Sequence, residues 1–135
     1  MKKIVFILAT VLLGCLLSGC SIVDTSGEKE NQLEYTIVGE KELPEELQTM
    51  INEKKTAEFK MTYADKENLY IVRGYGEQPT GGYSIQVNGV TLSDNGIHVD
   101  TNLIGPETEE EKGTEPSYPF IVLKTAYMDK TVMYN

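Results

Sequence analysis

Most of this chain alternates apolar and polar residues with a period of two, which is typical of strands that bury one face. The alternating segments are 58–63, 69–75, 83–88, 90–92 and 97–103. Asn95-Gly96, a favoured tight turn, stands between the last two of them. This pattern predicts a series of antiparallel hairpins.

One segment instead repeats with the period of a helix. Its apolar residues form a single stripe, made of Leu43, Leu47, Met50 and Ile51. Pro44 suits the first helical turn, and Lys54 and Lys55 suit the last because the negative end of the helix dipole lies there. We expect an amphipathic helix over 44–55 that lies on a sheet.

The remaining apolar segments are shorter. Residues 120–123 form a continuous apolar run, typical of a strand covered on both faces, and 33–38 and 132–134 are candidates for short strands. Together these patterns predict a mainly β fold of the α+β class. It would be an antiparallel sheet or a small β-sandwich, with one amphipathic helix near the N-terminus of the domain.

The first residues have the character of an export signal. A positive start at 1–3 is followed by an apolar run, Ile4 to Leu17, that is too short for a comfortable membrane span. Leu17-Ser18-Gly19-Cys20 then resembles the lipobox of bacterial lipoproteins. The resemblance implies that the signal peptide is 1–19, that cleavage precedes Cys20, and that the Cys20 sulfur carries a lipid. The alternative is an ordinary cysteine after a cleaved signal or in a short uncleaved anchor.

The polar segment that follows predicts the organisation of the exported chain. Residues 20–32 show no apolar period and are expected to be a flexible tether, and 33–135 would be the single folded domain. The domain would be held at the cell membrane by the lipid on Cys20 and would face outside the cytoplasm.

Charge and composition exclude several functions. Removal of Lys2 and Lys3 with the signal takes the formal net charge from −9 to −11, and Arg73 is the only arginine, so we expect no nucleic-acid binding. His98 is the only histidine, and it lacks partners with the spacing of a catalytic triad or a metal site. We therefore expect a protein that is not an enzyme and that uses no metal or cofactor.

The segment 104–117 is strongly acidic, and we call it the acidic segment. It is expected to be a long loop whose charges are solvated surface. The alternative is a loose Ca²⁺ site formed by Glu107, Glu109, Glu110 and Glu111.

The segment 74–83 holds four glycines, Pro79, Tyr75 and Tyr83 between two predicted strands. Glycine is required where φ is positive or where backbones approach closely, so we expect a shaped loop. The alternative is a wide hairpin connection. A phosphate-binding loop is excluded because no Lys-Ser or Lys-Thr pair and no helix follow the glycines.

Three segments resemble the C-terminal domain of PrcB-type protease-complex subunits. They are Tyr70-Ile71-Val72, the turn and strand from Gly76 to Val87, and Tyr118-Pro119 with the apolar run that follows. The resemblance spans about Leu69 to Lys124 and centres on Pro79-Thr80-Gly81-Gly82-Tyr83. It implies a small non-catalytic domain, common on exported lipoproteins and associated with a cell-surface protease complex.

The same turn is more distantly similar to the wedge loop of chagasin-type cysteine-protease inhibitors. Gln78 and Gly81 depart from that pattern, and the tryptophan of the partner loop is absent from this chain. An inhibitor of an extracellular protease, acting through Pro79–Tyr83, is therefore the alternative function.

The predicted function is a protein-binding module whose partner is another envelope or secreted protein, with a protease as the favoured candidate. The predicted partner-binding residues are Pro79, Thr80, Gly81, Gly82, Tyr83, Tyr118 and Pro119. The two tyrosines are expected to be contact anchors, with burial in the core as the alternative. The glycines would let the partner approach the backbone, and bulkier residues at 80–82 would leave stability nearly unchanged.

Overall fold

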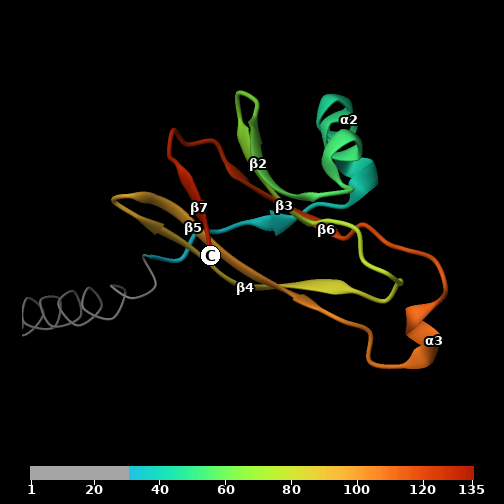
Figure 1. Cartoon of the computed structure of the whole chain (residues 1–135). Coiled ribbons are helices and arrows are strands. Elements are labelled where there is room, and N and C mark those ends of the chain that lie inside the picture. The colour runs from blue at the N-terminus through green and yellow to red at the C-terminus, as the bar shows by residue number, and fades with distance from the viewer. Residues whose placement is uncertain (1–30) are drawn as a thin grey trace, which may run out of the picture. The chain divides into compact units, whose positions relative to one another are not determined.

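The computed structural model describes residues 31–135, whose strands form two stacked sheets with a helix on the outside (Figure 1). The predicted signal peptide, Cys20 and nearly all of the predicted tether lie outside the described residues. Leu33–Asn135 form one compact unit. Within residues 31–135, no helix has the length and apolar character needed to cross a membrane.

The larger sheet is antiparallel and has the strand order β1-β6-β3-β2. Its strands are β1 (Thr36–Ile37), β6 (Phe120–Ala126), β3 (Asn68–Tyr75) and β2 (Glu58–Ala64). The predicted hairpin over 58–75 is confirmed by the pairing of β2 with β3. Ile121, Val122 and Leu123 are all buried, as expected for a strand covered on both faces.

The smaller sheet has the order β4-β5-β7 and consists of β4 (Ser84–Ser93), β5 (Gly96–Ile104) and β7 (Val132–Tyr134). β5 pairs antiparallel with β4 and parallel with β7. The predicted segments 83–88 and 90–92 are one strand, interrupted by a register shift between Val87 and Gly89. Such a bulge bends a strand without ending it.

The hairpin between β4 and β5 turns one residue earlier than the sequence predicted. Ser93 pairs with Gly96, so the turn is Asp94-Asn95 and not Asn95-Gly96. Gly96 has a φ of 144°, and a Cβ there would collide with the carbonyl oxygen of Thr131. The glycine is therefore required by the close approach of the segment before β7, a contact that local sequence does not reveal.

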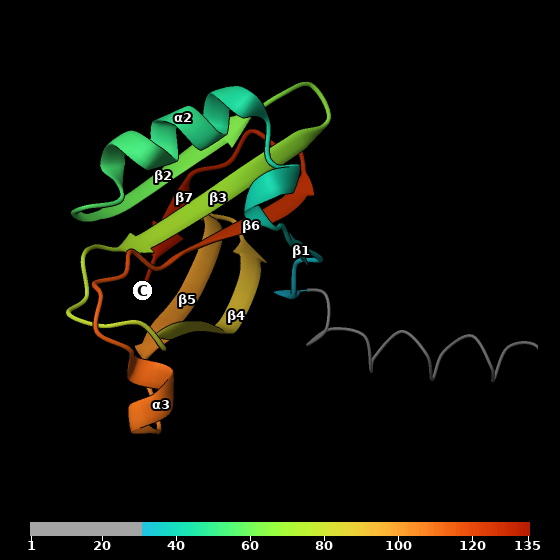
Figure 2. The same ribbon diagram turned by 90° about the vertical axis from the view of Figure 1, so that its right-hand side faces the viewer.

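The larger sheet is covered on both faces, as Figure 2 shows, by α2 (Glu45–Lys54) on one side and by the smaller sheet on the other. Alternation along β3 divides the core accordingly. Leu69 and Ile71 pack with the smaller sheet, whereas Tyr70 and Val72 pack with α2. The prediction of a mainly β fold with one amphipathic helix is confirmed.

The helix buries the predicted stripe. Leu43, Leu47 and Ile51 are buried against the larger sheet, and Met50 is half-buried. Pro44 stands immediately before the first helical residue, and the short 3-10 turn η2 (Glu40–Glu42) precedes it. Because β1 is the edge strand beside β6, the connection from β1 to α2 runs along the β6 side of the larger sheet (Figure 2).

Candidate functional site

The loop of residues 76–83, which joins β3 to β4, is held in a defined shape. Gly76 has a φ of 78°, and a Cβ there would lie 2.9 Å from the backbone nitrogen of Glu58. The backbone N–H of Glu77 donates to the carbonyl of Thr56 at 3.2 Å. The first part of the loop is thus attached to the segment before β2, as a shaped loop requires.

The middle of the 76–83 loop pairs with the residues that lead into β6. The N–H of Gln78 donates to the carbonyl of Ser117 at 2.8 Å, and the N–H of Ser117 donates to the carbonyl of Gln78 at 3.1 Å. The Ser117 hydroxyl also donates to the carbonyl of Thr80 at 2.7 Å. These bonds bring the two predicted site segments, 79–83 and 118–119, side by side.

Gly81 and Gly82, near the end of the loop, face the acidic segment of the same chain. Gly82 has a φ of 84°, and a Cβ there would lie 2.6 Å from the carbonyl oxygen of Glu111 and 2.7 Å from the Cβ of Pro106. A Cβ on Gly81 would lie 3.4 Å from the carbonyl oxygen of Lys112. The direction in which a side chain on Gly82 would point is therefore filled by this chain, whereas the glycine itself is exposed.

The acidic segment is also more ordered than expected. It contains the short helix α3 (Glu109–Lys112), which lies beyond the end of β5 (Figures 1 and 2). The Thr108 hydroxyl accepts a hydrogen bond from the N–H of Glu111 at 3.2 Å and so caps this helix. Within residues 31–135, no three His, Cys, Asp or Glu side chains are grouped as a metal site requires.

Tyr118 is half-buried and has two polar neighbours. Its hydroxyl donates to Oε1 of Glu77 at 3.2 Å, and Nζ of Lys55 lies 5.6 Å from the centre of its ring. The negative charge of Glu77 raises the pKa of the Tyr118 hydroxyl above its usual value. Tyr118 therefore remains a neutral hydroxyl with part of its ring accessible.

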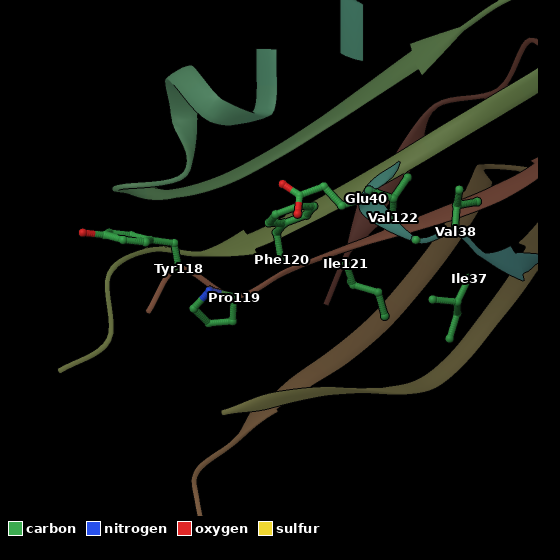
Figure 3. A pocket seen from close by; sticks show the side chains of 9 residues that line it. Ile37, Val38, Glu40, Tyr118, Pro119, Phe120, Ile121 and Val122 are labelled. Carbon is green, nitrogen blue, oxygen red and sulfur yellow. The ribbon is translucent and has the colours of Figure 1, made fainter. Parts of the chain in front are cut away.

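Two shallow hollows lie beside the start of β6. The larger, of about 360 Å³, is lined by Ile37, Val38, Gly39, Glu40 and the residues from Tyr118 to Val122 (Figure 3). The smaller, of about 270 Å³, is lined by Tyr83, Ser84, Ile85, Pro119, Phe120 and Ile121. Pro119, Phe120 and Ile121 belong to both, so the hollows adjoin along one stretch of β6.

The predicted site residues divide between these surfaces. Tyr83 and Pro119 line the smaller hollow, Tyr118 and Pro119 line the larger, and Pro79 is exposed on the 76–83 loop. Both tyrosines are half-buried, so each has a packed side and an accessible side. Thr80, Gly81 and Gly82 shape the loop rather than line a hollow.

Sequence patterns did not predict Ile37, Val38 and Glu40 as part of this surface. Ile37 belongs to β1 and Glu40 to η2, and Val38 lies between these elements. They reach this surface only because β1 pairs with β6. The exposed fraction of Ile37 is 57%, which is high for an isoleucine in a strand. The available sequence signal was the apolar pair Ile37-Val38 directly before a glycine.

A buried charge supports the strand that leads into the 76–83 loop. Arg73 is 8% exposed, its Nη2 lies 2.6 Å from Oε2 of Glu58, and its guanidinium lies 4.0 Å from the centre of the Tyr75 ring. The hydrogen bond from Arg73 lowers the pKa of the Glu58 carboxyl. The Tyr75 hydroxyl in turn lies 2.6 Å from the Thr101 hydroxyl, which connects the two sheets.

His98 lies away from both hollows. Its Nε2 lies 2.9 Å from the hydroxyl of Ser93 in the β4–β5 hairpin. Because Ser93 and His98 flank the turn of one hairpin, this contact has a local structural explanation.

Comparison with known proteins adds a family assignment. Residues 69–126 match the family model described as PrcB C-terminal, which confirms the resemblance seen in the sequence. The match begins in β3 and ends in β6, so it includes the 76–83 loop and both site segments. Searches of curated proteins and of solved structures found no match.

Proposed function

Residues 69–126 match the PrcB C-terminal family model, and from this match we propose that the chain is a non-catalytic cell-envelope lipoprotein that binds a partner protein. The resemblance to PrcB-type protease-complex subunits suggests that the partner is a surface protease or another member of its complex. In this role the domain would hold or stabilise the protease without chemistry of its own.

The observation that carries this proposal is the joining of 79–83 to 118–119 by the Gln78–Ser117 pairing. The resulting surface has a rigid, exposed Pro79 and two half-buried tyrosines beside open hollows. Binding to such a surface loses little conformational entropy, because the contact residues are already ordered. Aromatic side chains beside hollows are also the residue type that most often anchors protein interfaces.

Anchoring at the membrane is part of the proposal and rests on the lipobox alone, since 17–20 lie outside the described residues. Replacement Cys20→Ala should abolish labelling by radioactive palmitate and release the protein from the membrane fraction. Cys15→Ala is the matched control, because that cysteine lies within the proposed signal peptide. A Cys20→Ala protein that remains in the membrane fraction would contradict the lipid anchor.

Partner binding is tested by affinity purification of the full-length tagged protein from its own cells. The wild type and the control Lys66→Glu, changed in the exposed β2–β3 turn, should both co-purify with a protease identified by mass spectrometry and by activity. The Pro79→Glu and Tyr83→Ser proteins should no longer co-purify with the protease. Equal recovery with all four proteins would count against this surface, and absence of any protease would count against the function.

Inhibition of an extracellular protease is the second candidate. The rigid 76–83 loop, with Pro79 exposed, favours it because protease-inhibiting loops resist distortion when they bind. Titration of the purified protein against serine and cysteine proteases separates the two functions. An inhibitor lowers protease activity in proportion to its concentration, whereas a complex subunit leaves activity unchanged or raises it.

A further inference from the structure

The edge of the larger sheet is only partly covered along β6. β1 pairs with β6 at Thr36–Lys124 and Ile37–Leu123, and the N–H of Val38 donates to the carbonyl of Val122 at 3.0 Å. The chain then leaves the edge at Gly39 and enters η2. The first residues of β6 therefore have β3 on one side and, among residues 31–135, no strand on the other.

Hydrogen-bond alternation identifies the free groups on this edge. The N–H of Tyr75 donates to the carbonyl of Pro119, so residue 119 is directed toward β3. The Val38–Val122 bond shows that residue 122 is directed toward β1. Because successive residues of a strand point their backbone groups to opposite sides, the N–H and C=O of Phe120 are directed to the open edge.

Both hollows adjoin this free backbone. Figure 3 shows Ile37 and Ile121 pointing to one side of the edge, and Val38, Phe120 and Val122 to the other. The larger hollow opens in front of the edge, and the smaller lies between the start of β6 and the start of β4. An added strand would lie in the larger hollow, and every second side chain, on the face of Ile37 and Ile121, would point toward the smaller hollow.

The charges around the edge define the chemistry of the occupant. Glu40 lines the larger hollow, and Glu77 lies against Tyr118 at its end. Neither hollow is lined by a lysine or an arginine. The whole chain has a formal net charge of −9, so pairing with a second copy would bring like charges together.

We propose that this edge binds an extended segment of a partner protein, which adds a strand to β6 at Phe120. The segment would have apolar residues at alternate positions and a lysine or arginine beside Glu40. Main-chain hydrogen bonds to Phe120 would contribute affinity, and the two hollows would select the side chains. This inference rests on the proposed function in so far as the partner is a protein, and it adds the way in which that partner binds.

The probe is a phage-displayed library of random heptapeptides, selected on the full-length protein. Enriched peptides should alternate apolar residues and carry Lys or Arg. Binding of a synthetic enriched peptide should slow hydrogen exchange of the Phe120 amide. N-methylation of the peptide nitrogen that pairs with Phe120 should weaken binding about tenfold, because it removes one hydrogen bond and obstructs the strand.

A charge reversal provides the matched comparison. Glu40→Lys should weaken binding of the same peptide about tenfold. Glu42→Lys, in the same turn but outside the hollow, should change its affinity less than twofold. Failure to enrich any peptide, or enriched peptides that leave Phe120 exchange unchanged, would overturn the inference. Equal effects of the two reversals would also overturn it. If a protease still co-purifies with the Glu40→Lys protein, the proposed function stands and only the strand-addition inference fails.

Discussion

Ser117 and Gln78 hold each other by a reciprocal pair of backbone hydrogen bonds, 2.8 and 3.1 Å long, although 38 residues separate them in the chain. The pair joins the loop after β3 to the segment before β6. Every partner-contact residue predicted from the sequence lies within five residues of one of these two positions. The proposed surface therefore depends on a long-range contact and not on either loop by itself.

Ser117→Ala should lower the free energy of unfolding by about 1 kcal/mol, because it removes the hydroxyl donor and leaves the half-buried carbonyl of Thr80 without that partner. Urea unfolding measures the change. Thr114→Ala, at an exposed position of the same segment, is the control and should be neutral. If both variants unfold at the same urea concentration as the wild type, the Ser117 hydroxyl does not stabilise the loop.

Gly82→Ala should destabilise the protein by about 2–4 kcal/mol, since a positive φ and a collision with Glu111 both oppose the added methyl group. This differs from the expectation drawn from sequence that bulkier residues at 80–82 would be harmless. Thermal unfolding of the purified variant measures the loss.

Two other glycines separate the causes of this loss. Gly113 has a φ of 68° but open space around it, and Gly89 has open space without a positive φ. The expected order of destabilisation is Gly82→Ala, then Gly113→Ala, then Gly89→Ala. A Gly82→Ala protein no less stable than the Gly113→Ala protein would show that the acidic segment simply moves away.

Removing Glu58 should cost more stability than removing Arg73. Glu58→Gln leaves a buried guanidinium without its counter-charge. Arg73→Met leaves an exposed carboxylate that water solvates. It also removes the hydrogen bond from Nη1 to the carbonyl of Gly74, and Nε, which has no hydrogen-bond partner within residues 31–135. Urea unfolding of both variants at neutral pH measures the order. A larger loss for Arg73→Met would show that its stacking on Tyr75 and its hydrogen bond to Gly74 together outweigh the charge pair.

The same pair predicts a response to acid. Arg73 lowers the pKa of Glu58 in the folded state below its usual 4.5, so the pair stabilises the fold above that pH. This stabilisation should disappear as pH falls through the folded-state pKa of Glu58. The stability difference between wild type and Glu58→Gln should therefore shrink on acidification, and a constant difference would contradict the assignment.

Tyr134 predicts a loss of stability in alkali. Burial raises the pKa of its hydroxyl from 10.0 to about 12, against a smaller opposing effect of Arg73, and the hydroxyl donates to the carbonyl of Met61 at 2.8 Å. Because the unfolded tyrosine ionises first, stability should fall as pH rises from about 10 to about 12. Urea midpoints of wild type and Tyr134→Phe across this range measure the effect. The urea midpoint of Tyr134→Phe should be lower than that of the wild type near pH 10 and should fall less as the pH rises. Equal declines of the two midpoints would exclude Tyr134 as the cause.

The elements themselves were predictable because their signals are local. The period of two at 58–63 and 69–75, and the helical spacing from Leu43 to Ile51, depend only on neighbouring residues that share a face. The glycines and proline at 76–82 likewise indicated a shaped loop without knowledge of its contacts.

The surface formed by these elements was not predictable in full. Gly96 was assigned to a turn, although its need for glycine comes from Thr131, a residue distant in sequence. Ile37 and Glu40 joined the candidate site only through the pairing of β1 with β6. The acidic segment was expected to be solvated loop, yet its backbone packs against Gly82.

The sequence by itself determined the strands, the helix, the family resemblance and the loop around Pro79, because periodicity and residue conformational preference act over a few positions. Tertiary structure alone decided the pairing of β6 with β1 and β3 and of β7 with β5, the edge left open at Phe120 and the residues that surround it. These depend on contacts between distant segments, whose free energies involve the whole core and which no local pattern records.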